Sequence, residues 1–413
     1  MNATRRPLRS QFVWVLSGRV AAALLQAALM LLLARTVSPA EFGFFAAPYG
    51  VATVVQTVFD LGLPSLAVKR RSRDAGDGQV TTLLHLNSRL SLAMALAMLV
   101  VTVVLGFLVD DRYFFLLPLS LWAAAERNAD AWLGVALADG DVWVNMCNLV
   151  ARRTLNLVTF GILISLGGVQ PLLAFSIGSA VAAVASNVFA KYFVKKRLPS
   201  PGELRLRSAV GQSWPFWLSS VSSQARNADT AITALLAGAT QAGLYGAASR
   251  LTGPLRLFAT SLASLLLPAA SRRSGPDLIR LVRAIGAVIV LSSLGYGLIA
   301  LLVPALLPIA LGDAYKGSIA SIQIILIGLV FASASALVEA VLQGINKERY
   351  VATVSTLTSL IALSGVAVGA SMYGATGAAV GLSIAFVLQA ILLGFGLLVG
   401  LRGAPADKSV RKG

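Results

Sequence analysis

The 413-residue sequence has few of the residues from which soluble proteins build reactive sites. It contains one cysteine, Cys147, and one histidine, His85. Only 12% of its residues are charged, whereas soluble domains average about 25%. A single cysteine excludes an intramolecular disulfide, so we expect Cys147 to be a packing residue. For His85, near a predicted membrane boundary, an interfacial side chain is a simpler interpretation than a proton relay.

Signatures of catalysis and of metal or cofactor binding are also missing. No His, Cys and carboxylate cluster has metal-ligand spacing, and there is neither a Walker loop nor a glycine fingerprint. The largest loop is the basic stretch KKRLPSPGELRLR at 195–207, which leaves no room for a catalytic domain outside the membrane. We therefore expect no enzyme activity, no cofactor and no metal site.

Apolar residues, in contrast, are abundant: they make up 57% of the chain, and the mean hydropathy is +0.80. Runs of about 20 apolar residues, the length of a membrane-spanning helix, recur throughout. The first run is too long for a cleavable signal peptide and is predicted to be a membrane helix. The sequence predicts an all-α membrane protein with twelve transmembrane helices, at roughly 12–34, 41–68, 82–109, 113–137, 142–166, 171–194, 211–237, 243–268, 278–303, 317–343, 350–373 and 376–401.

The net charge of +17 follows the predicted topology. With both termini in the cytoplasm, 23 of the 34 Lys and Arg residues fall in the termini and the inner loops. The outer loops hold three, Arg35, Arg112 and Lys316. This asymmetry is the positive-inside rule of membrane proteins, so the basic charge does not indicate a nucleic-acid partner.

The two halves of the chain resemble each other. WVLSGRVAAALLQAALMLLLA starts at Trp14, and WLSSVSSQARNADTAITALLA starts at Trp217. GFFAA begins at Gly43 and GLYGAA at Gly243, each opening the second helix of its half. These matches indicate parallel six-helix repeats about an axis along the membrane normal. The predicted domains are an N-terminal bundle (1–198), a cytoplasmic linker (199–210), a C-terminal bundle (211–401) and a basic cytoplasmic tail (402–413).

Three stretches carry a resemblance to a known family: ARTVSPAEFGFFA (34–46), FDLGLPSLAVKR (59–70) and ARNADTAITALLAGATQAGLYGAASRL (225–251). On these residues the chain resembles the Wzx-type flippases of the multidrug/oligosaccharidyl-lipid/polysaccharide (MOP) exporter superfamily. The resemblance implies a two-lobed, MATE-like fold with alternating access through a cationic central cavity. It also implies a multi-pass protein of the bacterial inner membrane that flips oligosaccharide linked to undecaprenyl pyrophosphate for lipopolysaccharide O-antigen, capsule or exopolysaccharide. Its partners would be this lipid, membrane lipids and a coupling H⁺ or Na⁺.

We assign thirteen charged residues of the predicted helices to the membrane interior. A central Arg or Asp costs roughly 2.5–3.5 kcal/mol on insertion, so such residues normally face a bundle interior or a water-filled cavity. Eight are arginines: Arg19, Arg89, Arg127, Arg152, Arg153, Arg226, Arg250 and Arg256. Five are acids: Asp60, Glu126, Asp130, Asp229 and Glu339.

The surplus of arginine favours an anionic substrate. Guanidinium is always charged and binds phosphate oxygens in a two-pronged geometry. We predict that Arg153 and Arg256, and then Arg152, Arg19 and Arg250, bind the pyrophosphate, unless they form interhelical salt bridges with the acids. The same surplus disfavours the alternative of a MATE-like multidrug or cation antiporter, and the small outer loops disfavour a membrane polymerase or ligase.

The tetrapeptide RNAD occurs twice, at 127–130 and 226–229. Residues three apart share one face of a helix, so the Arg and Asp of each copy are placed to pair. The resemblance implies an acidic residue in the seventh helix, and Asp229 matches that position. We predict a role in ion coupling or gating for Asp229, and for Asp130 and Glu126 in the first half.

Overall fold

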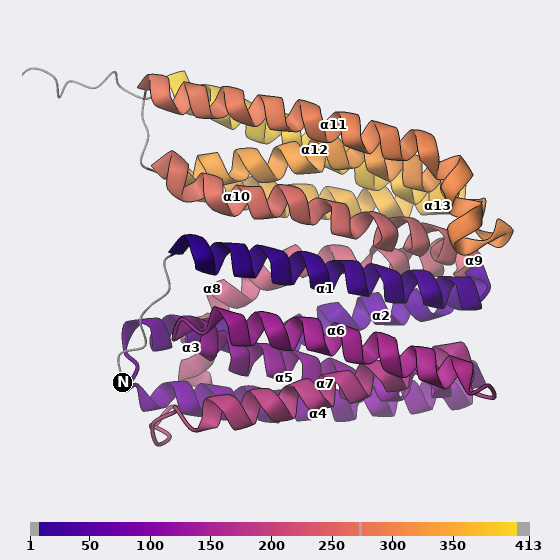
Figure 1. Ribbon diagram of the computed structural model, residues 1–413, viewed down its shortest axis with the longest axis horizontal. Helices are drawn as coiled ribbons and strands as arrows, with labels where there is room; N and C mark the ends of the chain where they lie inside the picture. The colour runs from indigo at the N-terminus through magenta and orange to yellow at the C-terminus, as the bar shows by residue number, and fades with distance from the viewer. Residues whose placement is uncertain (1–7, 272–274, 403–413) are drawn as a thin grey trace, which may run out of the picture. The chain divides into compact units, whose positions relative to one another are not determined.

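The computed structural model describes residues 8–271 and 275–402 (Figure 1). Every regular element in these ranges is a helix. The chain forms two compact units. Unit 1 contains residues 1–37 and 48–227, and unit 2 contains residues 38–47 and 228–413. The helix α2 (Pro39–Phe59) therefore belongs partly to each unit, with Pro48 inside the helix at the boundary.

Unit 1 is a helical bundle in which α5 packs against α7, and α6 packs against α1 and α7. Prolines occupy the first turn of α5 and α7, where their missing N–H would have no partner within the helix. Besides the second part of α2, the unit contains α1 (Leu8–Thr36), α3 (Leu63–Arg73), α4 (Gly78–Leu108), η1 (Asp111–Leu116), α5 (Pro118–Ala138), α6 (Val142–Ser165), α7 (Pro171–Lys195), α8 (Leu206–Gln224) and most of η2 (Ala225–Ala228).

Unit 2 is organised around α12, which packs against α10, α11 and α13. Its long last helix folds back on itself at a kink, where Gly374 has a φ of 57°. Besides the first part of α2, the unit contains α9 (Asp229–Thr252), η3 (Gly253–Leu255), α10 (Arg256–Ser271), α11 (Gly275–Leu311), η4 (Asp313–Tyr315), α12 (Ser318–Gly344) and α13 (Glu348–Arg402).

The predicted all-α membrane fold is confirmed. Eight helices of the described chain are long and apolar enough to cross a membrane, and the 52-residue apolar part of α13 counts as one of them. Its kink divides α13 into the last two predicted spans. A second kink, at Gly238 with a φ of 85°, divides α9 between the seventh and eighth predicted spans.

Three spans predicted as continuous helices are broken. The second predicted span breaks between α2 and α3, where Leu61 has a φ of 49° and Gly62 a φ of 73°. The Asp60 carboxylate stabilises this turn by accepting a hydrogen bond from the Gly62 N–H at 2.7 Å. The short 3₁₀ turns η2 and η3 interrupt the seventh and eighth spans. Hydropathy sums apolar character over a window and carries no information on such dihedral angles.

The compact units are not divided at the predicted linker, because α8 packs within unit 1. Ser213 Oγ donates to the carbonyl of Leu61 at 2.6 Å, and Trp217 Nε1 donates to the carbonyl of Val58 at 2.9 Å. A Cβ at Gly62 would lie 2.6 Å from the Ser213 carbonyl oxygen, so the backbones meet there without a side chain between them. The predicted division into six-helix bundles at 1–198 and 211–401 concerns sequence repeats and stays a prediction.

The linker itself lies against the start of α4. The Gly202 N–H donates to the Gly78 carbonyl at 2.9 Å. Thr81 Oγ1 donates to the Pro199 carbonyl at 2.8 Å, and Thr82 Oγ1 donates to the Gly202 carbonyl at 2.5 Å. The segment between the repeats is thus an ordered part of unit 1.

Glycines allow the closest helix crossings, as is common where helices pack in lipid. Within unit 2, a Cβ at Gly43 would lie 1.9 Å from the Ala239 carbonyl oxygen, and one at Gly243 would lie 1.7 Å from that of Pro39. Only glycine fits at either position.

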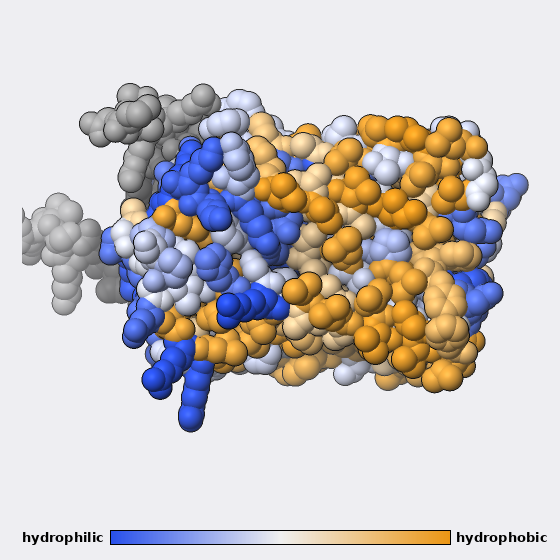
Figure 2. Space-filling view, turned by 90° about the horizontal axis from the view of Figure 1, so that it is seen from below, coloured by the Kyte–Doolittle hydropathy of each residue, from blue (hydrophilic) through white to orange (hydrophobic). Residues whose placement is uncertain are grey.

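Much of the surface is apolar (Figure 2). Large hydrophobic side chains are exposed along α4, for example Val100, Phe107 and Leu108, and along α11, for example Leu291 and Leu301. This exposure suits helices that face lipid. Cys147 is also exposed, so the expectation of a packing role is wrong. It lies on α6, and the hydropathy of this helix does not show which face is buried against other helices.

Candidate functional site

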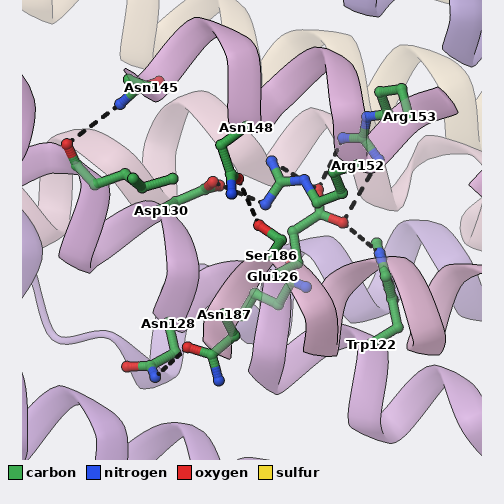
Figure 3. Close-up of polar contacts among 12 residues, drawn as sticks. Trp122, Glu126, Asn128, Asp130, Asn145, Asn148, Arg152, Arg153, Ser186 and Asn187 are labelled. Carbon is green, nitrogen blue, oxygen red and sulfur yellow. Dashed lines mark hydrogen bonds and ion pairs between the residues drawn. The ribbon is translucent and has the colours of Figure 1, made fainter. Parts of the chain in front are cut away.

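The charged residues of unit 1 form an ion-pair cluster between α5 and α6 (Figure 3). Arg153 Nη2 lies 2.8 Å from Glu126 Oε1, and Arg152 Nη2 lies 3.6 Å from the same oxygen. The indole N–H of Trp122, one turn before Glu126 on α5, donates to the other carboxylate oxygen. Glu126 is thus held by two guanidiniums and an indole.

The cluster extends toward the surface through Asp130. Arg152 Nη1 donates to Asp130 Oδ1 at 3.0 Å. The Arg152 side chain is 3% exposed and that of Asp130 is 47% exposed. Two arginines and two carboxylates meet here, so the formal charge of the cluster is zero. The sequence analysis gave interhelical salt bridges as the alternative to pyrophosphate binding. Arg152 and Arg153 both form such salt bridges in the structure.

Arg127 pairs with Asp60 and not with Asp130, its neighbour in the RNAD tetrapeptide. The Asp60 side chain is 1% exposed, at the break between α2 and α3. The predicted pairing within 127–130 is therefore wrong. Partners from the turn between α2 and α3 and from α6 replace the neighbour in the same helix.

A neutral polar network, which the sequence reasoning missed, runs through the same unit. Asn128 Oδ1 accepts hydrogen bonds from Asn87 Nδ2 at 3.2 Å and from Ser88 Oγ at 2.8 Å. Asn128 Nδ2 donates to Asn187 Oδ1 at 2.9 Å. These residues connect α4, α5 and α7. An asparagine in each of three apolar spans was the signal available in the sequence.

In unit 2, Asp229 begins α9 and accepts hydrogen bonds from neutral groups. Tyr245 Oη donates to Asp229 Oδ2 at 2.8 Å, and the Thr230 N–H donates to Oδ1 at 2.6 Å. Tyr245 is fully buried. The continuous helix on which the predicted 226–229 pairing depended is not present, because the 3₁₀ turn η2 ends at Ala228 and α9 begins at Asp229.

The other predicted arginines differ in exposure. The side chains of Arg19 on α1 and Arg89 on α4 are exposed, and those of Arg226 and Arg250 are half-buried. Arg250 Nη2 donates to the carbonyl of Ala46 at 3.3 Å, within unit 2. The structure therefore does not gather all five predicted substrate arginines into one site: Arg152 and Arg153 belong to the ion-pair cluster of unit 1.

Arg256 begins α10 in unit 2. Its side chain is exposed, and its guanidinium carbon lies 5.5 Å from the centre of the Phe386 ring. Among residues 8–271 and 275–402, no carboxylate lies within ion-pair distance of it.

Glu339 on α12 is held by α13. Ser355 Oγ donates to Glu339 Oε1 at 2.6 Å, and Gln389 Nε2 donates to the same oxygen at 2.8 Å. The sequence analysis counted Glu339 among the intramembrane acids and missed Ser355 and Gln389. In the part of the chain that the structure describes, no group of three or more His, Cys, Asp and Glu side chains is arranged to hold a metal.

Solved structures with this fold are transporters and a flippase. An inward-facing multidrug resistance MATE family transporter of the MOP superfamily matches with a TM-score of 0.74 at 18% identity, over 96% of this chain and 100% of that one. The lipid II flippase MurJ in an inward closed conformation matches with a TM-score of 0.72 at 13% identity, over 94% and 87%. A MOP superfamily transporter from Pyrococcus furiosus matches with a TM-score of 0.65 at 16% identity, over 96% of each chain.

Comparison of the sequence with protein families gives one match that covers most of the chain. Residues 8–274 match the family described as polysaccharide biosynthesis protein. No curated protein matches the sequence. The matched range is well over half of the 413 residues, and the fold is that of the MOP transporters. The chain therefore belongs to the polysaccharide biosynthesis protein family and is a multi-pass membrane protein with the fold of MOP superfamily transporters.

Proposed function

We propose that the protein flips a polyprenyl-pyrophosphate-linked oligosaccharide, with undecaprenyl as the lipid, across the bacterial inner membrane. It acts as a secondary transporter by alternating access and supplies the synthesis of O-antigen, capsule or exopolysaccharide. Membership of the polysaccharide biosynthesis family supports this substrate class, and the MurJ-like fold supports flipping of a lipid.

The observation that carries the proposal is Arg256. Its guanidinium is exposed and lies outside ion-pair distance of the described carboxylates. A pyrophosphate would supply the oxygens that its planar fork fits. Arg19, also exposed, is the second candidate, and Arg250 the third.

We rank Arg152 and Arg153 below Arg256 as substrate-binding residues, because their guanidiniums already form ion pairs with Glu126 and Asp130. For ion coupling, Asp229 is the leading candidate. Its carboxylate accepts hydrogen bonds from the neutral donors Tyr245 and Thr230, and we expect it to take up a proton or Na⁺ during transport. Asp130 is the more accessible acid of unit 1, and Glu126 the less accessible one.

The test is the leaflet distribution of lipid-linked oligosaccharide in cells depleted of the protein. We expect the lipid to accumulate in the cytoplasmic leaflet, and wild-type protein to restore its outward movement. Arg256→Ala is expected not to restore it. Arg280→Ala is the matched control, because Arg280 is 79% exposed and pairs only with Asp277 at the start of α11. No accumulation after depletion would contradict the proposed substrate.

A MATE-like multidrug or cation antiporter is the second candidate, favoured by the similarity of the fold to the MATE transporter. The exposed Arg256 disfavours it, because a cationic drug would be repelled there. In depleted cells, increased accumulation of cationic dyes together with normal lipid distribution would support the antiporter.

A further inference from the structure

Arg256 and Glu339 are neighbours that do not meet. Arg256 opens α10 and lies over Phe386 of α13, whereas Glu339 of α12 is bonded to Gln389 of α13. Phe386 and Gln389 are three residues apart, so they lie on the same face of the helix within one turn. Arg256 and Glu339 thus both lie against this face of α13, although no ion pair joins them within residues 8–271 and 275–402.

Two neutral donors account for this separation. Ser355 Oγ and Gln389 Nε2 both donate to Glu339 Oε1, at 2.6 and 2.8 Å. They also lie 3.5 Å from each other, so the three side chains form a closed triangle between α12 and the two halves of α13. Gln389 is 6% exposed, and its side chain is therefore fixed by packing. A carboxylate that accepts two bonds from fixed donors is held in one position.

Without these donors, Glu339 would have a better alternative. A carboxylate and a guanidinium that face each other form paired hydrogen bonds, which are stronger than bonds to neutral donors. Glu339 would then occupy the fork of Arg256 that a phosphate needs.

We propose that Ser355 and Gln389 are positioning residues that hold Glu339 away from Arg256 and so keep this guanidinium open to an anionic lipid headgroup. Glu339 is an internal competitor of the substrate, restrained by α13. This inference rests on the proposed function. It adds that Ser355, Gln389 and Glu339 together control access to the anion site at Arg256.

The experiment measures binding of undecaprenyl pyrophosphate to the purified full-length protein in detergent, with undecaprenol as the control for the chain alone. Gln389→Leu is expected to bind the pyrophosphate about tenfold more weakly than wild type, which corresponds to about 1.4 kcal/mol. Ser355→Ala is expected to bind it about threefold more weakly, because one of the two donors remains.

The decisive variant combines Gln389→Leu with Glu339→Gln, which removes the competitor's charge. The double variant is expected to bind the pyrophosphate at least as tightly as wild type, and Glu339→Gln alone equally so. A purely structural role of Gln389 would leave the double variant as weak as the single one. Should Gln389→Leu not fold, the same cycle is run with Ser355→Ala.

The outcomes separate the inference from the proposed function. Wild-type binding that depends on Arg256, with no loss in Gln389→Leu or no recovery in the double variant, overturns the positioning role alone. Wild-type binding no tighter than that of undecaprenol, or unchanged by Arg256→Ala, overturns the proposed anion site and the positioning role with it.

Discussion

The two units treat their intramembrane arginines differently. In unit 1, Arg127, Arg152 and Arg153 each pair with a carboxylate. In unit 2, Arg256 is exposed and lies on an aromatic ring, while Glu339 is held by Ser355 and Gln389. The buried arginines of unit 1 thus neutralise acids, whereas Arg256, like the exposed Arg19 and Arg89 of unit 1, forms no ion pair among the described residues.

The burial of an arginine side chain therefore determines whether it needs a carboxylate partner. The Arg152 side chain is 3% exposed, and a buried charge without a partner is strongly destabilising. The exposed Arg256 needs no such partner, because solvent or a ligand can balance it. We therefore expect substitutions in unit 1 to reduce stability and substitutions at Arg256 to reduce transport.

The largest expected effect is that of Glu126→Leu. This substitution leaves Arg153 without its carboxylate and Arg152 with Asp130 alone. Breaking a buried pair costs about 3–5 kcal/mol, which we expect to observe in unfolding of the protein in detergent. Asp277→Leu, at an exposed pair, is the control and should leave stability unchanged. Equal stability of Glu126→Leu and wild type would contradict the claim that the ion pairs of unit 1 stabilise the fold.

Arg256→Ala should have the converse effect. We expect stability within about 0.5 kcal/mol of wild type, as for most surface substitutions. Flipping should fall about 10- to 100-fold, because a hydrogen bond to a charged group contributes about 1.5–3 kcal/mol. Both are measured on one preparation in proteoliposomes, beside Arg153→Ala. A loss of stability in Arg256→Ala equal to that in Arg153→Ala would contradict the distinction.

Asp60→Asn tests the second pair of unit 1. The Arg127 side chain is 26% exposed, so water can partly replace the lost carboxylate. We expect a loss of about 1–3 kcal/mol in the free energy of unfolding. The double variant Asp60→Asn/Arg127→Gln should recover part of this loss, because neighbouring substitutions are not additive. Additive losses would show that the two side chains do not stabilise each other.

The smallest effect is expected at the exposed pair of Asp110 and Arg112, in the loop before η1. Hydrogen bonds from the Arg112 side chain and backbone lower the pKa of Asp110 from 3.8 to about 2. A lowered pKa stabilises the folded state above the unfolded value, and this stabilisation disappears as the pH falls from about 4 to about 2. Asp110→Asn should therefore lower the midpoint of thermal unfolding slightly at pH 7 and not at pH 2. High salt should reduce the difference.

The sequence predicts the spans of this fold well. Predicted helices at 142–166 and 171–194 correspond to α6 (Val142–Ser165) and α7 (Pro171–Lys195), because a long apolar run has few alternatives to a helix in lipid. The breaks were not predictable in the same way. Leu61, with a φ of 49°, is an apolar residue in a conformation that its type does not favour.

The candidate site was predictable only as a set of residue types. The thirteen intramembrane charges are visible in the sequence, but their partners are not. Arg127 and Asp60 are 67 residues apart, and Arg153 and Glu126 are 27 apart, whereas sequence patterns report neighbours within one helix. The polar residues that hold these charges, such as Gln389 and Trp122, look like ordinary members of apolar helices.

The crossing of α2 and α9 has a consequence for the origin of the chain. The sequence predicts that Gly43 and Gly243 open equivalent helices of two repeats, and each faces the other's backbone nitrogen and the carbonyl four residues before it. A contact in which a residue meets its own equivalent is that of a two-fold symmetric dimer. In an ancestor of half the length, one glycine would have met its copy in a second chain. A single substitution there would have changed both sides of the contact at once, whereas after duplication each side can vary separately.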